Sequence, residues 1–534
     1  MKFVFPFLTC TTSFATMSYV MITASLVTEI TGNEILSQCL TMGPYLLGLG
    51  VGSFLGDRVK ETKLLETLWR VEWGSVLISP LLPLFQLMAI FAFLVFSPLG
   101  TTLDLRIGLR FVLIIGGACS FLTGLLGGAQ LPIILKKFSG SAMERILALS
   151  YIGPLFAGPF IVYCDSNTIS IGQQITFVAL IQLMGLLVLF LITEKKKMLL
   201  SGLGIALIMI YALGKIYPWQ EVITTKNIYV KAKLNPSEFK KLPETVRFIE
   251  KFGEFVRLKT PYQSIDLFTI PSFPEYNFPT ETTLYLNRKP QFDEMNIPVY
   301  HQGMILGGVN ILQRKPKNVL ILGGGDGFLL KELKERDLFE NVTMVELDKG
   351  VLNFSRENPK IAGMNSNILL DWDVPHDGIE IRVEDAISFL RKNADKKFDL
   401  ILIDFPYPNG HELSKLYSFE FYRMVLRVLD KSGVVVIDLP IQYDQNGELN
   451  LKGRVVLKTL MAATKTRPMV YGPKAPFVTF RADKLDPQFD YSKFPEDMHM
   501  SARLNMIKLL EMSDVSPEIW KKTPVNSMFL PAGF

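Results

Sequence analysis

The sequence has few cysteines, and their positions define no site. All four (Cys10, Cys39, Cys119 and Cys164) lie in the first third of the 534 residues, with the spacing neither of a metal site nor of a disulfide framework. We therefore predict no metal site and interpret these cysteines as small apolar side chains of helices.

Strong charge is also lacking. The formal net charge is +5, and no compact basic patch with interleaved aromatic residues is present, so we do not expect nucleic acid as a partner. Apolar side chains, in contrast, are abundant, at 49% of the residues. A chain of this length and apolar content is too long for one ordinary domain and too apolar to be wholly soluble.

The apolar residues are concentrated before residue 217. Most of the apolar stretches there approach the length of about 20 residues that spans a bilayer. The seven stretches cover approximately 3–27, 37–55, 73–98, 108–135, 146–163, 173–193 and 198–214. We predict a multi-pass transmembrane bundle of about 7 helices over residues 1–217.

The first stretch continues well past Cys10 without a good cleavage context, so we interpret it as a membrane anchor and not as a cleaved secretory signal. Glycine-rich runs at 46–56 and 122–132 are typical of closely packed membrane helices. A substrate path through the bundle needs buried charges, which are scarce in this part of the sequence. We therefore favour an anchor over a transporter.

The remaining residues predict two further parts. Alternating segments and proline-rich turns within residues 218–315 indicate a linker and a small antiparallel β subdomain. From 317 to 440, short buried strands alternate with amphipathic helices, which predicts a Rossmann-like, doubly wound parallel sheet of the class I methyltransferase type. We assign this α/β domain, with a C-terminal extension, to residues 316–534.

Ligands of such sheets bind at the carboxyl ends of the strands. After the first strand comes a turn from Gly323 to Gly327 that includes Gly325 and Asp326; its glycines allow a tight turn, and the following helix start favours oxygen-rich groups. Glu346, about 20 residues further on, ends the next strand where an acid accepts hydrogen bonds from a ribose. Together they predict a nucleoside ligand.

Two more strands also end in acids. One is followed by Asp385 and Ala386, where a carboxylate meets an adenine amino group, and the other ends at Asp404. A single Asp or Glu at such a place is usually a solvated loop charge or a helix cap. Acids at successive strand ends along one edge favour a binding site.

At this point the sequence resembles the polyamine aminopropyltransferases, or spermidine synthases, and specifically their membrane-bound branch. The resemblance covers about 257 to 440 and depends on the order and spacing of its motifs. These are TPYQS (260–264), VYHQGM (299–304), VLILGGGDG (319–327), VELD (345–348), VEDAISFL (383–390), DLILIDFPYPN (399–409) and LYSFEFYRMVLRVLDKSGVVVI (416–437).

The resemblance implies a reaction in which decarboxylated S-adenosylmethionine gives its aminopropyl group to a diamine such as putrescine and leaves methylthioadenosine. It implies no prosthetic group. By this analogy Asp404 and Tyr300 are catalytic, and Tyr300, His301, Asp326, Asp404 and Tyr407 bind the amine. The nucleoside is contacted by Gln263, Gly323, Gly325, Asp326, Glu346, Asp385 and Ala386.

Charge at the site agrees with the decarboxylated co-substrate. Asp326 lies where a methyltransferase must accommodate the carboxylate of S-adenosylmethionine, and an anion there repels that group and attracts an ammonium. Catalysis needs a neutral amine, so a carboxylate such as Asp404 first attracts the ammonium and then accepts its proton.

Two positions depart from the family pattern. Tyr407 stands where the family has a second aspartate, and a phenol is neutral at pH 7. Asn287 and Arg288 replace an Asp-Gly turn. Three hypotheses therefore remain: an active aminopropyltransferase, a weak homologue that senses polyamine or nucleoside, and an S-adenosylmethionine-dependent methyltransferase, which Asp326 disfavours.

Two arguments about the side of the membrane on which the α/β domain lies oppose each other. Basic loops near 58–63, 136–145 and 195–197 fall on one side of the bundle, which should be the cytoplasm. If the seventh stretch crosses, the residues after 217 lie outside; if it is interfacial, they lie inside. That stretch is the shortest, and the nucleoside is made in the cytoplasm. We expect a multi-pass protein of the cell membrane with a cytoplasmic α/β domain, lipid contacts and a homodimer or homotetramer.

Overall fold

The computed structural model describes most of the chain. The described residues are 4–31, 34–96, 102–138, 141–190, 196–233, 252–272, 279–408, 411–438, 449–465, 468–473, 475–483, 488–510, 517–529 and 532. Contacts divide the chain into two compact units, Met1–Pro290 and Gln291–Phe534. The domain boundaries near 217 and 315 stay predictions.

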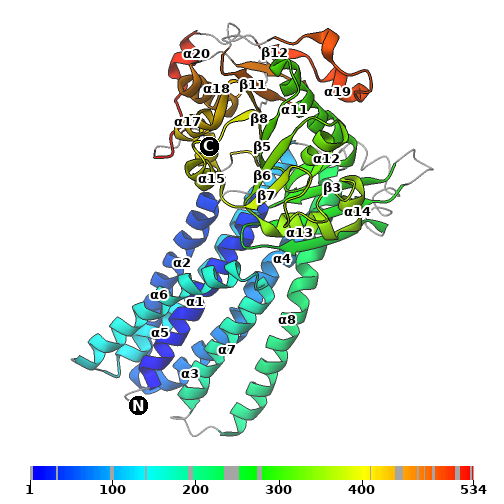
Figure 1. The fold of residues 1–534 in the computed structure, drawn as a ribbon. Coiled ribbons are helices and arrows are strands. Elements are labelled where there is room, and N and C mark those ends of the chain that lie inside the picture. Colours follow the sequence, from blue (N-terminus) through cyan, green and yellow to red (C-terminus); the bar gives the residue numbers. More distant parts are fainter. Residues whose placement is uncertain are drawn as a thin grey trace. The chain divides into compact units, whose positions relative to one another are not determined.

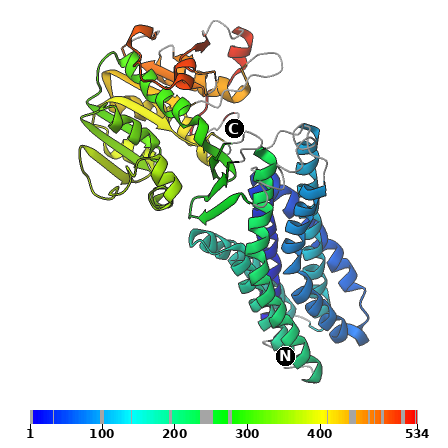
Figure 2. The same ribbon diagram turned by 90° about the vertical axis from the view of Figure 1, so that its right-hand side faces the viewer.

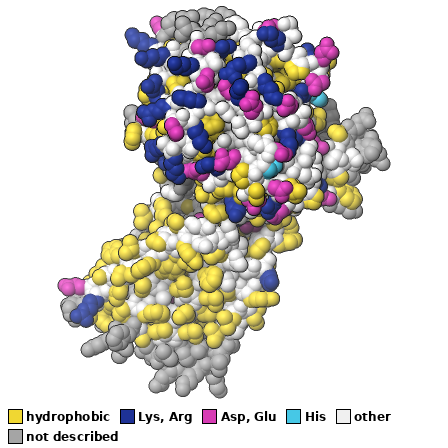
Figure 3. Space-filling view, viewed as in Figure 1, with side chains coloured by type: hydrophobic (Ala, Val, Ile, Leu, Met, Phe, Trp, Pro, Cys, Tyr) yellow, Lys and Arg dark blue, Asp and Glu magenta, His cyan; other side chains and the backbone are white. Residues whose placement is uncertain are grey.

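The first unit begins with helices whose exposed side chains are largely apolar (Figures 1 and 3). They are α1 (Val4–Thr31), α2 (Glu34–Asp57), α3 (Leu64–Ile78), α4 (Leu81–Phe96), α5 (Thr102–Leu135), α6 (Ser141–Ser166), α7 (Ile171–Phe190) and α8 (Lys196–Lys233). Among the described residues, six helices are long and apolar enough to cross a membrane, or up to 7 if the bent pair formed by α3 and α4 counts as one span.

Two of the predicted stretches differ from the helices. The stretch 73–98 is broken, because α3 ends at Ile78 and α4 begins at Leu81, with a bend of 43° between them. The stretch 198–214 belongs to α8, whose apolar part Leu203–Lys226 has 24 residues. The seventh stretch is therefore long enough to cross, and the bent pair becomes the uncertain span.

The glycine-rich runs bring α2 and α5 into backbone contact. A Cβ at Gly48 or Gly52 of α2 would lie 2.2 Å from the carbonyl oxygen of Phe121 or Leu125, respectively. The contact is reciprocal, because a Cβ at Gly124 of α5 would lie 2.2 Å from the carbonyl oxygen of Tyr45. Small residues that allow such approach are typical of helix pairs in lipid.

The first unit also holds the predicted small sheet. Strands β1 (Glu254–Lys259), β2 (Ser264–Ile270), β3 (Glu281–Leu286) and β4 (Lys289–Asp293) follow in this order, and β2 pairs antiparallel with β1 and β3. Asn287 and Arg288 form the turn between β3 and β4 with φ of 48° and 63°. The turn therefore forms in the left-handed region without the Asp-Gly pair.

Polar contacts join this sheet to the end of α8. The hydroxyl of Tyr229 donates to Oδ2 of Asp266 at 2.5 Å, and Arg257 pairs with Oδ1 of Asp266 at 3.0 Å and with Glu221 at 2.8 Å. All of these side chains are at least nine-tenths buried. Buried and mutually paired, they fix the direction in which α8 leaves the bundle.

The second unit is built on an eight-stranded sheet with the order β12-β10-β11-β9-β8-β5-β6-β7. Its strands are β5 (Asn318–Gly323), β6 (Asn341–Glu346), β7 (Ile379–Val383), β8 (Phe398–Asp404), β9 (Leu429–Asp438), β10 (Met469–Tyr471), β11 (Phe477–Arg481) and β12 (Lys508–Leu510). The pairs from β9 to β7 are parallel, but β10, β11 and β12 add antiparallel strands. The predicted parallel sheet is therefore mixed, and the C-terminal extension forms its antiparallel edge.

Helices cover both faces of the sheet (Figures 1 and 2). Alternate residues of β5 point to opposite faces: Leu320 and Leu322 belong to one buried cluster, and Val319 and Ile321 to the other. The first cluster includes residues of α15 (Ala386–Lys392), α17 (Phe419–Val428) and α18 (Leu451–Thr464). The second includes residues of α11 (Ile297–Leu312), α12 (Phe328–Glu335) and α13 (Lys349–Glu357).

Candidate active site

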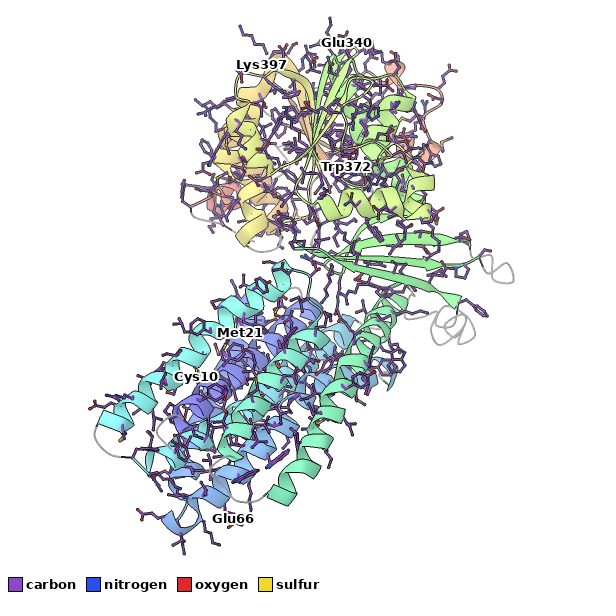
Figure 4. All side chains as sticks on the ribbon, turned by 60° about the horizontal axis from the view of Figure 1, so that its bottom comes forward. Cys10, Met21, Glu66, Glu340, Trp372 and Lys397 are labelled. Atoms are coloured by element: carbon purple, nitrogen blue, oxygen red, sulfur yellow. The ribbon has the colours of Figure 1, made fainter. Side chains whose placement is uncertain are left out.

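The candidate site lies where the parallel strands end. The amino ends of β6 and β8 are marked by Glu340 and Lys397, which lie at one edge of the second unit (Figure 4). At the opposite edge β5 ends beside β8, with Gly323 paired to Asp404, while β6 ends at Glu346. The sheet therefore brings these residues together, although they are far apart in the sequence.

The turn after β5 requires glycine for two reasons. Gly323, Gly324 and Gly327 have φ of 89°, 75° and 83°, in the region that side chains disfavour. A Cβ at Gly323 would also lie 2.0 Å from the carbonyl oxygen of Asp404, and one at Gly325 would lie 2.9 Å from Oε2 of Glu346. The glycines thus allow the turn to pack directly against the two acids.

Asp326 and Glu346 line this turn as half-buried carboxyls. Asp326 accepts a hydrogen bond from the backbone N–H of Phe328 at 3.0 Å, and Glu346 accepts one from that of Asp348 at 2.9 Å. Burial raises the pKa of Asp326, and burial with the nearby carboxylates of Asp348, Asp404 and Asp326 raises the pKa of Glu346 to about 7. Closely spaced carboxyls with raised pKa values are stabilised by a cation, so this edge suits a cationic ligand.

Tyr300 and Asp404 form the closest pair of the site. The hydroxyl of Tyr300 on α11 donates to Oδ1 of Asp404 at 2.6 Å. Burial, together with the carboxylate of Asp326, raises the pKa of Asp404. Burial and Asp404 raise the pKa of Tyr300, so its phenol stays a neutral donor. Asp404 is thereby held in one orientation, with a higher proton affinity than an ordinary aspartate.

His301 lies beneath this pair. It is 2% exposed, its Nδ1 is 2.8 Å from the carbonyl oxygen of Ile297, and its ring centroid is 5.1 Å from that of Phe328. Burial lowers the pKa of His301. The ring packs against Tyr300 and Phe328, and its contact with the amine stays a prediction.

Asp385 caps the helix that follows β7. Its Oδ1 accepts a hydrogen bond from the N–H of Ser388 at 2.8 Å, and Ala386 is the buried first residue of α15. Asp385 is exposed. A helix cap is a sufficient structural role for this acid, and its contact with adenine stays a prediction.

Asp438 was missed in the sequence. It ends β9, is 6% exposed, and follows Ile437, which pairs with Ile403 of β8, so it lies at the strand end next to Asp404. Its negative charge raises the pKa of Tyr407, Tyr300 and Tyr417. The signal was present, because the run VVVID has the same form as the strand that ends at Asp404. Tyr407 itself is 44% exposed, and Asp438, burial and Asp404 raise its pKa, so it carries no negative charge.

Gln263 belongs to the first unit. It closes the turn between β1 and β2, where its N–H donates to the hydroxyl of Thr260 at 3.0 Å. It lines a cavity of about 390 Å³ together with Met21, Ile161, Asp165 and other residues of the same unit. Met21 lies nearer than Cys10 to the sheet end of the bundle (Figure 4). Within the described residues no group of three or more His, Cys, Asp or Glu side chains could hold a metal ion.

Comparison with known proteins finds relatives of one kind. Residues 298–460 match the family described as the spermine/spermidine synthase domain. The polyamine aminopropyltransferase of Oceanobacillus iheyensis is 25% identical over 416 residues, which cover 76% of this chain and 72% of that protein. Polyamine aminopropyltransferase 2 of Bacillus cereus is 31% identical over 194 residues, 35% of this chain and 48% of that protein.

A solved spermidine synthase, from Thermotoga maritima, aligns with 23% identity over 48% of this chain and 84% of its own, at a TM-score of 0.37. The match to the Oceanobacillus protein covers more than the residues after 217 can supply, so it includes part of the helical region. The resemblance to the polyamine aminopropyltransferases is confirmed: residues 298–460 match the spermine/spermidine synthase domain, and the chain is similar to polyamine aminopropyltransferases over 76% of its length.

Proposed function

We propose that this protein transfers the aminopropyl group of decarboxylated S-adenosylmethionine to a diamine such as putrescine and releases methylthioadenosine. The observation that carries the proposal is the hydrogen bond of 2.6 Å between Tyr300 and Asp404 at the end of β8, beside the glycine-rich turn. It provides an oriented base of raised pKa next to a turn that a nucleoside can approach.

The chemistry needs a neutral amine nitrogen. In the proposed reaction Asp404 attracts the ammonium group and accepts one proton. The freed lone pair then attacks the carbon of the aminopropyl group next to the sulfonium sulfur. A C–N bond forms, the C–S bond breaks, and its electron pair neutralises the sulfonium to give the thioether of methylthioadenosine. Tyr300 aims Asp404, and Asp326 and Glu346 favour cationic and hydroxyl-bearing parts of the donor.

In this proposal Asp438 supplies the negative charge that the family has at the position of Tyr407. A diamine carries two positive charges, and Tyr407 is a neutral phenol. We assign the second negative charge to Asp438, which ends the strand next to that of Asp404 and raises the pKa of Tyr300 and Tyr407. The amine site would then use carboxylates from two neighbouring strand ends, β8 and β9.

The test is turnover by the full-length protein in detergent. Decarboxylated S-adenosylmethionine is supplied with a series of diamines, and methylthioadenosine and the product amine are measured by mass spectrometry. We expect amine-dependent product, and a decrease in kcat of about 10²- to 10⁴-fold in Asp404→Asn. Glu340→Gln, on the opposite edge of the sheet, is the control and should keep full turnover.

The same assay separates the alternatives. Tight binding of the decarboxylated nucleoside without any turnover would contradict the transfer reaction and support a sensor, the hypothesis that Tyr407 favours. Methyl transfer from ordinary S-adenosylmethionine would support a methyltransferase and would contradict the role given to Asp326.

For the helical region we propose insertion in the cell membrane, with the second unit in the cytoplasm, where the nucleoside donor is made. Six crossings return the chain to the side on which it began, whereas seven leave it on the opposite side. The structure has six helices that qualify singly, and the bent pair decides whether there is a seventh. With the loop at Lys60 in the cytoplasm, a cytoplasmic second unit requires that α3 and α4 together do not cross.

A further inference from the structure

A carboxylate lies inside the helical bundle, where few charges were expected from the sequence. Glu72 of α3 is 0% exposed, and the next turns of the same helix bury Leu68, Trp69 and Val76. An ionisable side chain within apolar helices is costly to bury, and it usually marks a path or a binding site. The described bundle is therefore more than a plain apolar anchor.

Only one of the two carboxylate oxygens of Glu72 is satisfied. Its Oε2 accepts a hydrogen bond of 3.1 Å from the hydroxyl of Thr12 on α1, and that hydroxyl oxygen accepts one of 3.3 Å from Nε2 of Gln130 on α5. Its Oε1 is buried and has no hydrogen-bond partner. In the part of the chain that the structure describes, no Lys or Arg pairs with Glu72.

A second unsatisfied acceptor lies close by. One turn further along α3, Ser75 accepts a hydrogen bond of 2.6 Å from Nε2 of Gln182 on α7. This bond leaves the Oε1 atom of Gln182 buried without a partner. Residues three apart on a helix are neighbours, so Glu72 and Ser75, which contacts Gln182, lie on one face of α3.

The bundle is also broken at this place. After Ser75 the helix α3 ends at Ile78, and α4 starts at Leu81 at an angle of 43°. The hydroxyl of Tyr217 on α8 donates to the carbonyl oxygen of Pro80 at 3.1 Å, which satisfies one of the groups freed by the break. In membrane proteins, broken helices are tolerated where they are enclosed by protein or line a ligand site.

The missing partner must bring several donors and a positive charge. Buried acceptors without donors cost free energy. A proton on Glu72 supplies a single O–H donor and no positive charge. Calcium or magnesium needs about six or more oxygen ligands. A primary ammonium group carries three N–H donors, one positive charge and no acceptor. We propose that Glu72, Gln182 and the hydroxyls beside them form a binding site for a protonated primary amine.

The choice of a diamine as the probe rests on the proposed function; the site itself does not. Equilibrium dialysis of the full-length protein in detergent with radiolabelled putrescine gives the number of amines bound per chain. The informative variant is Glu72→Gln, which keeps the acceptor for Thr12 and removes the charge. The matched control is Glu66→Gln on the same helix, at the end of the bundle, where Glu66 is half exposed and pairs with Arg70 (Figure 4).

We expect Glu72→Gln to bind one putrescine fewer per chain than the wild type and Glu66→Gln. Equal numbers in the two variants would overturn the inference, whatever turnover shows. Loss of one site in Glu72→Gln from a protein without turnover would support the inference and count against the proposed function. The two proposals can therefore fail separately.

A second measurement uses the wild-type protein, so that folding of a variant is not at issue. Dicyclohexylcarbodiimide is apolar and adds to carboxyl groups in apolar surroundings, and peptide mass spectrometry locates the resulting acylurea. If putrescine occupies the site, a concentration ten times its Kd should slow labelling of Glu72 about tenfold. Labelling of Glu72 at the same rate with and without putrescine would overturn the inference.

Discussion

Asp404 and Asp326 act on each other through charge, and this sets the pH dependence of the proposed reaction. The negative charge of Asp326 raises the pKa of Asp404. Because the base must be deprotonated to accept a proton, kcat/KM should fall as the pH drops through the pKa of Asp404, above the ordinary value of about 3.9 for an aspartate.

Asp326→Asn removes that charge, so the pKa of Asp404 should fall and activity should persist to lower pH. We expect the acid limb of the kcat/KM profile to move by about one pH unit toward acid. The measurement is the profile of both proteins at constant ionic strength. If the acid limb of the profile does not move, the group that titrates there is not Asp404. Because Asp326 is also predicted to contact the donor, a higher KM for the nucleoside is expected as well.

Substitution of Asp438 and substitution of Tyr407 should change the KM for the amine to different extents. If Asp438 supplies the second negative charge, Asp438→Asn should raise the KM for diamines by about 10-fold or more and leave the KM for the nucleoside unchanged. Tyr407→Phe should change the amine KM less than about threefold, because the phenol is neutral in either case. Steady-state kinetics with each substrate varied in turn decides. Equal effects of the two substitutions would contradict the assignment to Asp438.

At the scale of elements, the pairing of α2 with α5 depends on glycines at the contact. Gly52→Ala places a Cβ 2.2 Å from the carbonyl oxygen of Leu125, so the two helices must move apart. We expect a loss of stability of about 1–3 kcal/mol. Gly50 lies two residues earlier on the same helix, and a Cβ there meets nothing within 4 Å. Gly50→Ala should therefore be neutral or stabilising by up to about 1 kcal/mol.

Thermal unfolding of both variants in detergent, followed by tryptophan fluorescence, measures this difference. Similar melting temperatures for Gly52→Ala and Gly50→Ala would mean that α2 and α5 are not in backbone contact.

For the whole molecule, the number of crossings fixes the side of the membrane. Under the proposed cytoplasmic placement, the loop at Lys137 is outside, and the turn at Asn167 and the surface at Lys397 are inside. Seven crossings reverse all three, and the Lys and Arg residues near 136–145 favour that reversal. Of the third basic loop, Lys195 lies outside the described residues. These basic residues therefore favour a second unit outside the cell, against the cytoplasmic placement that we expect because the nucleoside is made in the cytoplasm.

Single cysteines at these three exposed positions, treated in intact cells with an impermeant thiol reagent, decide between the two arrangements. Cys10, Cys39, Cys119 and Cys164 are first replaced by serine. We expect labelling of Lys137→Cys and none of Asn167→Cys or Lys397→Cys. The reverse pattern would place the second unit outside. Lys60→Cys is the control, because its loop stays inside in both arrangements.

Local patterns in the sequence determined most of the fold. The strand runs and the amphipathic helices between 317 and 440 are read from periods of two and 3.6 residues, and β5 ends and α12 begins at the two sides of the predicted turn 323–327. Such periods do not show which strands are neighbours. The antiparallel edge formed by β10, β11 and β12 was therefore not predicted, because pairing over long sequence separations depends on tertiary packing.

The candidate site was likewise predicted only in part from the sequence. Asp326, Glu346 and Asp404 were predicted because each follows a buried strand, and a parallel sheet places such ends at one edge. The contact of Tyr300 with Asp404, the place of Asp438 beside Tyr407 and the burial of Glu72 appear only in three dimensions. The physical reason is that sequence spacing gives the residue types available to a site, whereas their distances, burial and pKa values depend on how the elements pack.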